Sequence, residues 1–133
     1  MRRARIFGAL TIAGIALYLV LGVVAQLLPP HYSPVRQAES DLAVGPYGYV
    51  MTINFVVRGA LSLTLLAGLM QGVADRARSK IGEALIGVWA VGAFLLALFP
   101  TDVNSRATVH GIIHLVVALV ALCAVTAGEL LVS

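Results

Sequence analysis

The stretch FPTDVNSRATVHGIIH, from Phe99 to His114, is a short polar segment between two long apolar runs. The run before it covers about residues 81–98, and the run after it covers about residues 108–131. Each run is long enough to cross a bilayer, which takes roughly 17–25 residues of α-helix. The stretch is therefore predicted to be a loop at a membrane surface. It carries four side chains that can be charged: Asp102, Arg106, His110 and His114.

Composition extends the membrane prediction to the whole chain. The 133 residues suit one domain. Hydrophobic residues make up 60% of the chain and charged residues 11%, with a mean hydropathy of +0.98, whereas a soluble domain carries roughly 25% charged residues. A water-soluble core of this length cannot absorb so much apolar surface. The sequence therefore predicts a single all-α integral membrane domain, and one cysteine, Cys123, excludes an internal disulfide framework.

Four apolar runs predict a four-helix transmembrane bundle, with helices at about residues 6–28, 49–73, 81–98 and 108–131. No alternating strand pattern is present. A secretory signal peptide is the alternative for the first run, but its apolar region would be only about 7–15 residues long. Pro29 and Pro30 follow the first run and end that helix, because proline cannot continue one.

The basic residues predict which way the helices run. Six lie before the first helix or between the second and third: Arg2, Arg3, Arg5, Arg76, Arg78 and Lys80. The other two loops hold only Arg36 and Arg106. Because basic loops stay in the cytoplasm, both termini are predicted to be cytoplasmic, the N-in/C-in orientation. This clustering at helix ends also argues against nucleic acid as the partner of a chain whose formal charge is +3.

Arg58 is the residue within a predicted span that most needs an explanation. It lies roughly 13 Å below the start of its helix, and Asn54 and Ser62 share its face at a spacing of four. An arginine at such depth costs at least a few kcal/mol. Three interpretations remain open: it snorkels to the outer head groups, it forms a buried ion pair, or it binds a ligand. We expect it to pair with Asp102 or with an anion bound beside it.

His110 and His114 are four residues apart and would lie on one face of the last helix. Two such histidines can bind a metal, but they need at least one more ligand, for which Asp102 is the candidate. The segment lacks the glutamate of the HExxH motif of metalloproteases. We therefore expect no tightly bound structural zinc, and the pattern specifies no cofactor. Histidines that only pack remain an alternative, as does a loop-capping role for Asp102.

Three segments carry a family resemblance: GPYGYVMTINFVVRGAL at residues 45–61, LFPTD at 98–102 and HGIIH at 110–114. Together they resemble the bacterial integral membrane family of domain of unknown function 998, over about residues 43–122. The resemblance implies a polar site in a multi-pass protein of the bacterial cytoplasmic (inner) membrane, without an established reaction. Members commonly have about six spans, whereas this chain has room for four. It is then either a short form or a chain that pairs with itself or with another subunit.

These patterns predict an outer-leaflet polar site that binds or converts an amphipathic small molecule or lipid. Arg58 would hold an anionic group, with Asn54 and Tyr47 as further ligand contacts. His110 and His114 would transfer a proton or ligate a metal, and Asp102 would orient one of them. The alternative is an accessory or structural subunit, whose polar residues lock helix packing or contact a partner chain. A transporter dimer is disfavoured, because neither inverted repeats nor interrupted helices are seen.

Overall fold

The computed structural model describes residues 2–103 and 107–133, so the Arg106 position lies outside the described residues. Its elements follow in the order α1 (Arg2–Leu27), the short 3₁₀ helix η1 (Glu39–Ala43), α2 (Gly48–Gly72), η2 (Asp75–Ala77), α3 (Lys80–Leu98) and α4 (Val109–Val132). All four α-helices are long and apolar enough to cross a membrane, and the described residues contain no strand. The predicted all-α fold with four membrane-spanning helices is confirmed.

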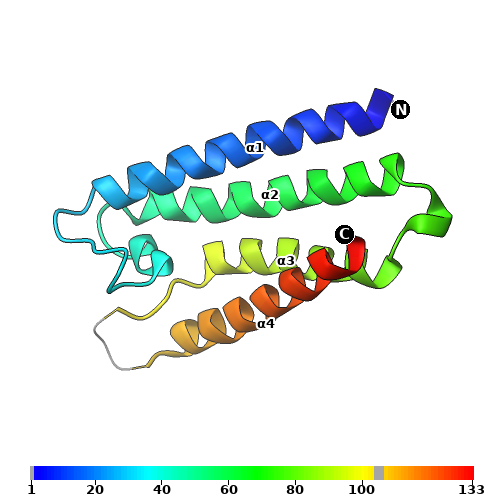
Figure 1. Cartoon of the computed structure of the whole chain (residues 1–133). Helices are drawn as coiled ribbons and strands as arrows, with labels where there is room; N and C mark the ends of the chain where they lie inside the picture. Colours follow the sequence, from blue (N-terminus) through cyan, green and yellow to red (C-terminus); the bar gives the residue numbers. More distant parts are fainter. Residues whose placement is uncertain (1, 104–106) are drawn as a thin grey trace.

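The helices form an open layer rather than a closed ring (Figure 1). Helix α1 packs on α2, α2 packs on α3, and α3 packs on α4, while η1 lies against α2. In the described parts of the chain the backbones of the other long-helix pairs approach each other at few points, although side chains of α4 reach the core around α2. The α2–α3 connection is short, whereas α1 and α2 are joined by the longer loop that contains η1.

The buried core lies at the η1 end of the layer. It contains Val50, Met51 and Phe55 of α2, which pack with side chains from α1, η1 and α3: Ala25, Leu42 and Leu96. Large apolar side chains face outward along the whole length of all four helices. Such an outward apolar surface suits a lipid environment, where it need not be hidden from water. The η1 end is therefore the part of the molecule in which residues from several elements meet.

Small residues set the spacing between neighbouring helices. A Cβ atom added to Gly92 would lie 2.6 Å from the Cβ atom of Ala121, and one added to Gly128 would lie 3.0 Å from the carbonyl oxygen of Gly82. Helices α3 and α4 thus approach through small side chains, as is common in membranes. Helices α1 and α2 are joined by a hydrogen bond between the hydroxyl groups of Thr11 and Thr64, 2.8 Å apart.

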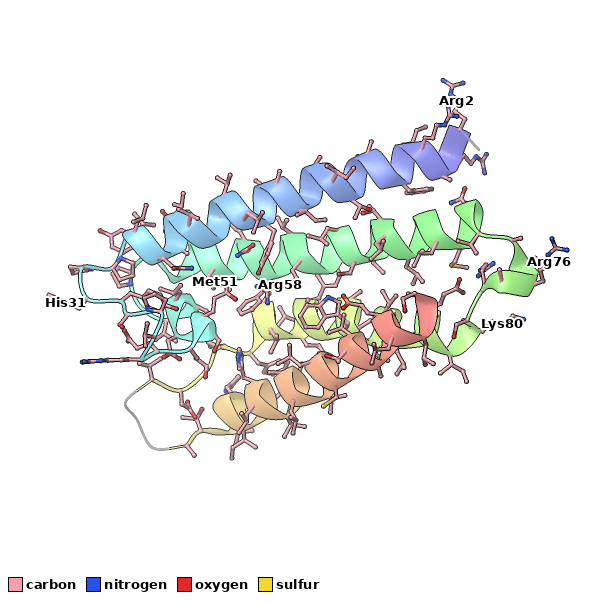
Figure 2. The ribbon with its side chains drawn as sticks, viewed as in Figure 1. Arg2, His31, Met51, Arg58, Arg76 and Lys80 are labelled. Atoms are coloured by element: carbon pink, nitrogen blue, oxygen red, sulfur yellow. The ribbon has the colours of Figure 1, made fainter. Side chains whose placement is uncertain are left out.

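The basic residues gather at the end opposite η1. Figure 2 shows Arg2, Arg76 and Lys80 at this end and His31 at the other. Between η2 and α3, Arg78 donates hydrogen bonds to Glu83 at 2.5 and 2.6 Å and to Asp75 at 2.8 Å. The hydrogen bonds from its side chain to Glu83 are the main reason that the pKa of Arg78 is raised. These bonds fasten the α2–α3 connection to the first turn of α3.

Replacing Gly92 with alanine should destabilise the protein by about 1–3 kcal/mol, the usual effect of overpacking. The new methyl group would collide with Ala121, which has no flexible side chain that can move aside. Gly8→Ala is the matched control, because a Cβ atom there meets nothing within 4 Å. The control should be neutral or stabilising by up to about 1 kcal/mol. Unfolding of both variants in detergent measures the difference, and equal effects would contradict the close α3–α4 packing.

Candidate functional site

Arg58 is held by residues from η1 and α1. Its Nη2 atom donates to Oε2 of Glu39 at 3.0 Å and to the hydroxyl group of Tyr18 at 3.1 Å. The Arg58 side chain is 14% exposed and that of Glu39 is 38% exposed. The sequence-based prediction that Arg58 pairs with Asp102 is therefore wrong, because the carboxylate that reaches it comes from the longer first loop.

Glu39 reaches Arg58 because the loop between α1 and α2 folds back against α2. Glu39 begins η1, which lies against α2. The turn is fastened by Asp41, whose carboxylate accepts a hydrogen bond from the backbone N–H of Ala38 at 3.2 Å. Sequence reasoning missed Glu39, since no helical spacing links it to Arg58. The available signal was only that both Glu39 and Asp102 lie on the same predicted side of the membrane.

Three aromatic rings surround the Arg58 guanidinium. Its central carbon lies 4.7 Å from the ring centre of Tyr18, 5.5 Å from that of Phe55 and 5.8 Å from that of Trp89. These rings belong to α1, α2 and α3, so Arg58 connects three helices. Cation–π attraction is strongest where water is excluded. Figure 2 shows Arg58 between α2 and α3, a position that differs from a side chain snorkelling along the outside of its helix.

Two polar atoms on this face of α2 have no hydrogen-bond partner among the described residues. Asn54 is fully buried, its amide nitrogen lies 3.9 Å from the sulfur of Met51, and its Oδ1 atom is unpartnered. The Nε atom of Arg58, one turn along, is likewise buried and unpartnered. Gly22 of α1 leaves room here, because a Cβ atom there would lie 3.6 Å from the Asn54 amide nitrogen. Asn54 thus extends the polar face of Arg58 as predicted.

His114 is buried and has a defined tautomer. Its Nδ1 atom lies 2.6 Å from the carbonyl oxygen of Phe99, and its ring makes an edge contact with Phe55. A carbonyl oxygen can only accept, so Nδ1 carries the hydrogen and Nε2 of the neutral ring is an acceptor. In the described parts of the chain Nε2 makes no hydrogen bond, yet it is not among the fully enclosed unpartnered atoms. Nε2 is therefore not fully enclosed.

His110 and His114 occupy different environments. His110 is exposed in the first turn of α4, where its ring lies 5.7 Å from the ring of Phe99. Within residues 2–103 and 107–133, no three His, Cys, Asp or Glu side chains are placed to hold a metal ion. His110 is exposed and His114 is buried, although the two lie about one turn apart on the same helix.

Asp102 holds Thr108, the residue that caps the start of α4. Its carboxylate accepts hydrogen bonds from the backbone N–H and the hydroxyl of Thr108, both at 2.7 Å. These bonds from Thr108 lower the pKa of Asp102. The Thr108 hydroxyl in turn accepts from the backbone N–H of Gly111 at 3.1 Å. A Cβ atom on Gly111 would overlap the Asp102 carboxylate, which explains why glycine follows His110. Asp102 could have been a loop cap or a functional group, and its hydrogen bonds to Thr108 support the loop cap.

Arg58 and His114 line one cavity of about 230 Å³, which we call the Arg58 cavity. Its walls come from η1, α2, α3 and α4, namely Glu39, Ser40, Phe55, Arg58, Trp89, Leu96, His114, Ala118 and Leu122. The polar face of Arg58 was predicted to meet the last helix, and His114 is the residue of that helix that shares a cavity with Arg58. Asp102 and His110 are not part of this lining. Tyr47 is 42% exposed just before α2 and is also outside it.

Residues 12–133 match the model of the family described as protein of unknown function (DUF998). The chain belongs to this family. The predicted resemblance is confirmed, and the match is longer than the segments that suggested it, since it extends from α1 to the end of the chain. No match is found among curated proteins or among solved structures. This DUF998 protein thus joins a family that supplies the membrane-helix architecture but no activity.

Double-mutant cycles should couple Arg58 to Glu39 and leave it uncoupled from Asp102. Arg58→Met and Glu39→Gln together should destabilise less than the sum of the single changes, by about 1–2 kcal/mol, because the pair is neither fully buried nor fully exposed. Arg58→Met and Asp102→Asn should be additive, since the two residues share no partner in the described structure. Unfolding in detergent measures both cycles, and the reverse result would restore the Asp102 pairing.

Proposed function

We propose that this DUF998 protein binds an amphipathic molecule or lipid whose anionic head group enters the Arg58 cavity. The proposal is supported by the guanidinium of Arg58, which lies among apolar helices beside a cavity. Some of its N–H donors have no partner in the described residues. Nη2 makes two hydrogen bonds, Nε makes none, and Nη1 makes none to the described residues. A guanidinium can hold a phosphate or carboxylate through two parallel bonds.

The shape of the Arg58 cavity supports a head group rather than a whole soluble ligand. Its volume of about 230 Å³ is below the roughly 300–1,000 Å³ of typical small-molecule pockets. Its polar residues lie at the η1 end, whereas Ala118 and Leu122 follow along α4, and Leu122 is 54% exposed on the outer surface. A polar head beside Arg58 would therefore leave an apolar tail along a helix face that is suited to lipid.

His114 adds a hydrogen-bond acceptor to the same cavity. Its Nδ1–H is committed to the Phe99 carbonyl, so Nε2 is the atom left to meet a ligand. If the bound molecule is converted, this Nε2 is the group positioned to accept a proton. The proposed proton-transfer role passes to His114 rather than His110, because only His114 lines the cavity.

An accessory role in a membrane complex is the second candidate, and two observations favour it. Asp102 and His114 both tie the end of α3 to the start of α4, which is a packing function. The open layer also leaves α2 as the main helix on which α1 packs in the described structure. A second copy or another membrane subunit would cover such a face. This candidate predicts a stable protein without ligand whose partner remains attached on purification.

Ligand binding can be followed by the fluorescence of Trp89, which is the only tryptophan and lines the Arg58 cavity. Titration of the protein in maltoside micelles with a brominated phospholipid should quench Trp89 with saturation. Arg58→Gln should weaken binding by at least about tenfold, because a charge-assisted pair is lost. Arg36→Gln is the control, since Arg36 is an exposed residue of the first loop. Equal, unsaturable quenching in all three proteins would favour the accessory role.

We further propose that both termini face the cytoplasm of a bacterial cell and that η1 and the Arg58 cavity lie toward the outer leaflet. The gathering of basic residues at the end opposite η1 supports this orientation (Figure 2). A reporter fused after Ser133 should be active only as a cytoplasmic marker. One inserted at Val35, which is 92% exposed, should be active only as an external marker. The opposite pattern would place the cavity in the inner leaflet.

A further inference from the structure

We infer that the head group bound in the Arg58 cavity is zwitterionic, with an ammonium group close to a phosphate or carboxylate. This inference rests on the proposed binding function and names the ligand class. It follows from the charges that line the cavity and from the hydrogen-bonding atoms that remain free on them.

The charges lining the Arg58 cavity already cancel. Arg58 contributes one positive charge and Glu39 one negative charge, and the two are in contact at 3.0 Å. With His114 neutral, the other lining residues are uncharged. A purely anionic head group would therefore bring a second negative charge beside one guanidinium. Like charges in a partly buried site repel strongly, because little water is present to screen them.

Each member of the ion pair also has a free end. The bond between them uses Nη2 of Arg58 and Oε2 of Glu39. Nη1 of Arg58 makes no hydrogen bond in the part of the chain that the structure describes, and the carboxylate of Glu39 accepts only the one from Arg58 there. Oε1 of Glu39 lies toward Gly22 of α1, where an added Cβ atom would be 3.8 Å from it. A phosphate at Nη1 and an ammonium at the exposed part of the Glu39 carboxylate would extend the pair into alternating charges, and the sum would remain zero. Glu39 is accessible for this contact, with 38% of its side chain exposed.

Trp89 offers the ammonium group a second favourable contact. Its ring lines the same cavity and already lies 5.8 Å from the Arg58 guanidinium. Aromatic faces attract ammonium groups in the same way as guanidinium groups. Because the cavity continues along Ala118 to the exposed Leu122, a lipid is the favoured source of the head group. Free phosphoethanolamine carries the same charges without a tail and serves to distinguish the two sources.

Two phospholipids with the same acyl chains test the inference: one with an ethanolamine head group and one with a glycerol head group. Their affinities are measured by brominated-lipid quenching of Trp89 in uncharged maltoside micelles. The wild-type protein should prefer the ethanolamine lipid, on the order of tenfold. Glu39→Gln leaves the cavity with one net positive charge, so this variant should prefer the glycerol lipid. Glu129→Gln, the same substitution at an exposed residue near the end of α4 and outside the Arg58 cavity, should keep the wild-type preference.

The outcomes separate this inference from the proposed function. Arg58-dependent binding that favours the glycerol lipid in the wild-type protein overturns the zwitterion and leaves the binding function intact. A lipid preference that is unchanged in Glu39→Gln also overturns it. Absence of saturable, Arg58-dependent binding overturns both. Competition by free phosphoethanolamine as strong as that by the lipid would overturn the lipid source. The wild-type comparison requires no variant, so it decides the inference even if Glu39→Gln does not fold.

Discussion

The positive charge of Arg58 within an apolar helix is the constraint on which the arrangement of the η1 end depends. A guanidinium at this depth must be surrounded by acceptors or aromatic faces, since lipid supplies neither. Tyr18, Trp89 and Glu39 meet this need from α1, α3 and η1. One side chain on α2 thereby determines how three other elements lie around it. The same contacts leave part of the guanidinium directed to a cavity.

The polar stretch between α3 and α4 has a different role from that of Arg58. Asp102, Thr108 and Gly111 form a chain of contacts that starts α4, and His114 returns to the carbonyl of Phe99. These contacts use side chains of types that also occur in active sites. Their geometry shows that most of them satisfy backbone groups at helix ends. Of these residues only His114, which bonds to the Phe99 carbonyl, also lines the Arg58 cavity.

The open layer has a consequence for how a molecule would reach the Arg58 cavity. The lining of the cavity includes Leu122 of α4, which is 54% exposed on the outer surface. At its other end, η1 covers the polar groups. A ligand that already resides in the membrane could enter from the side without passing η1. This geometry agrees with an amphipathic ligand better than with one that arrives from water.

The sequence by itself determined the all-α fold, the number of helices long enough to span a membrane, the place of Arg58 within one of them and its shared face with Asn54. These features follow from local rules: apolar runs of membrane length, prolines after a helix, and a spacing of four on one face. Only the tertiary structure decided that Glu39 is the partner of Arg58. The path of the loop between α1 and α2 depends on packing over α2, which no periodicity records. The tertiary structure also decided that His110 is exposed while His114 is buried. His110 in the first turn of α4 stays exposed, whereas one turn on the ring of His114 contacts Phe55 and its Nδ1 atom reaches the carbonyl oxygen of Phe99.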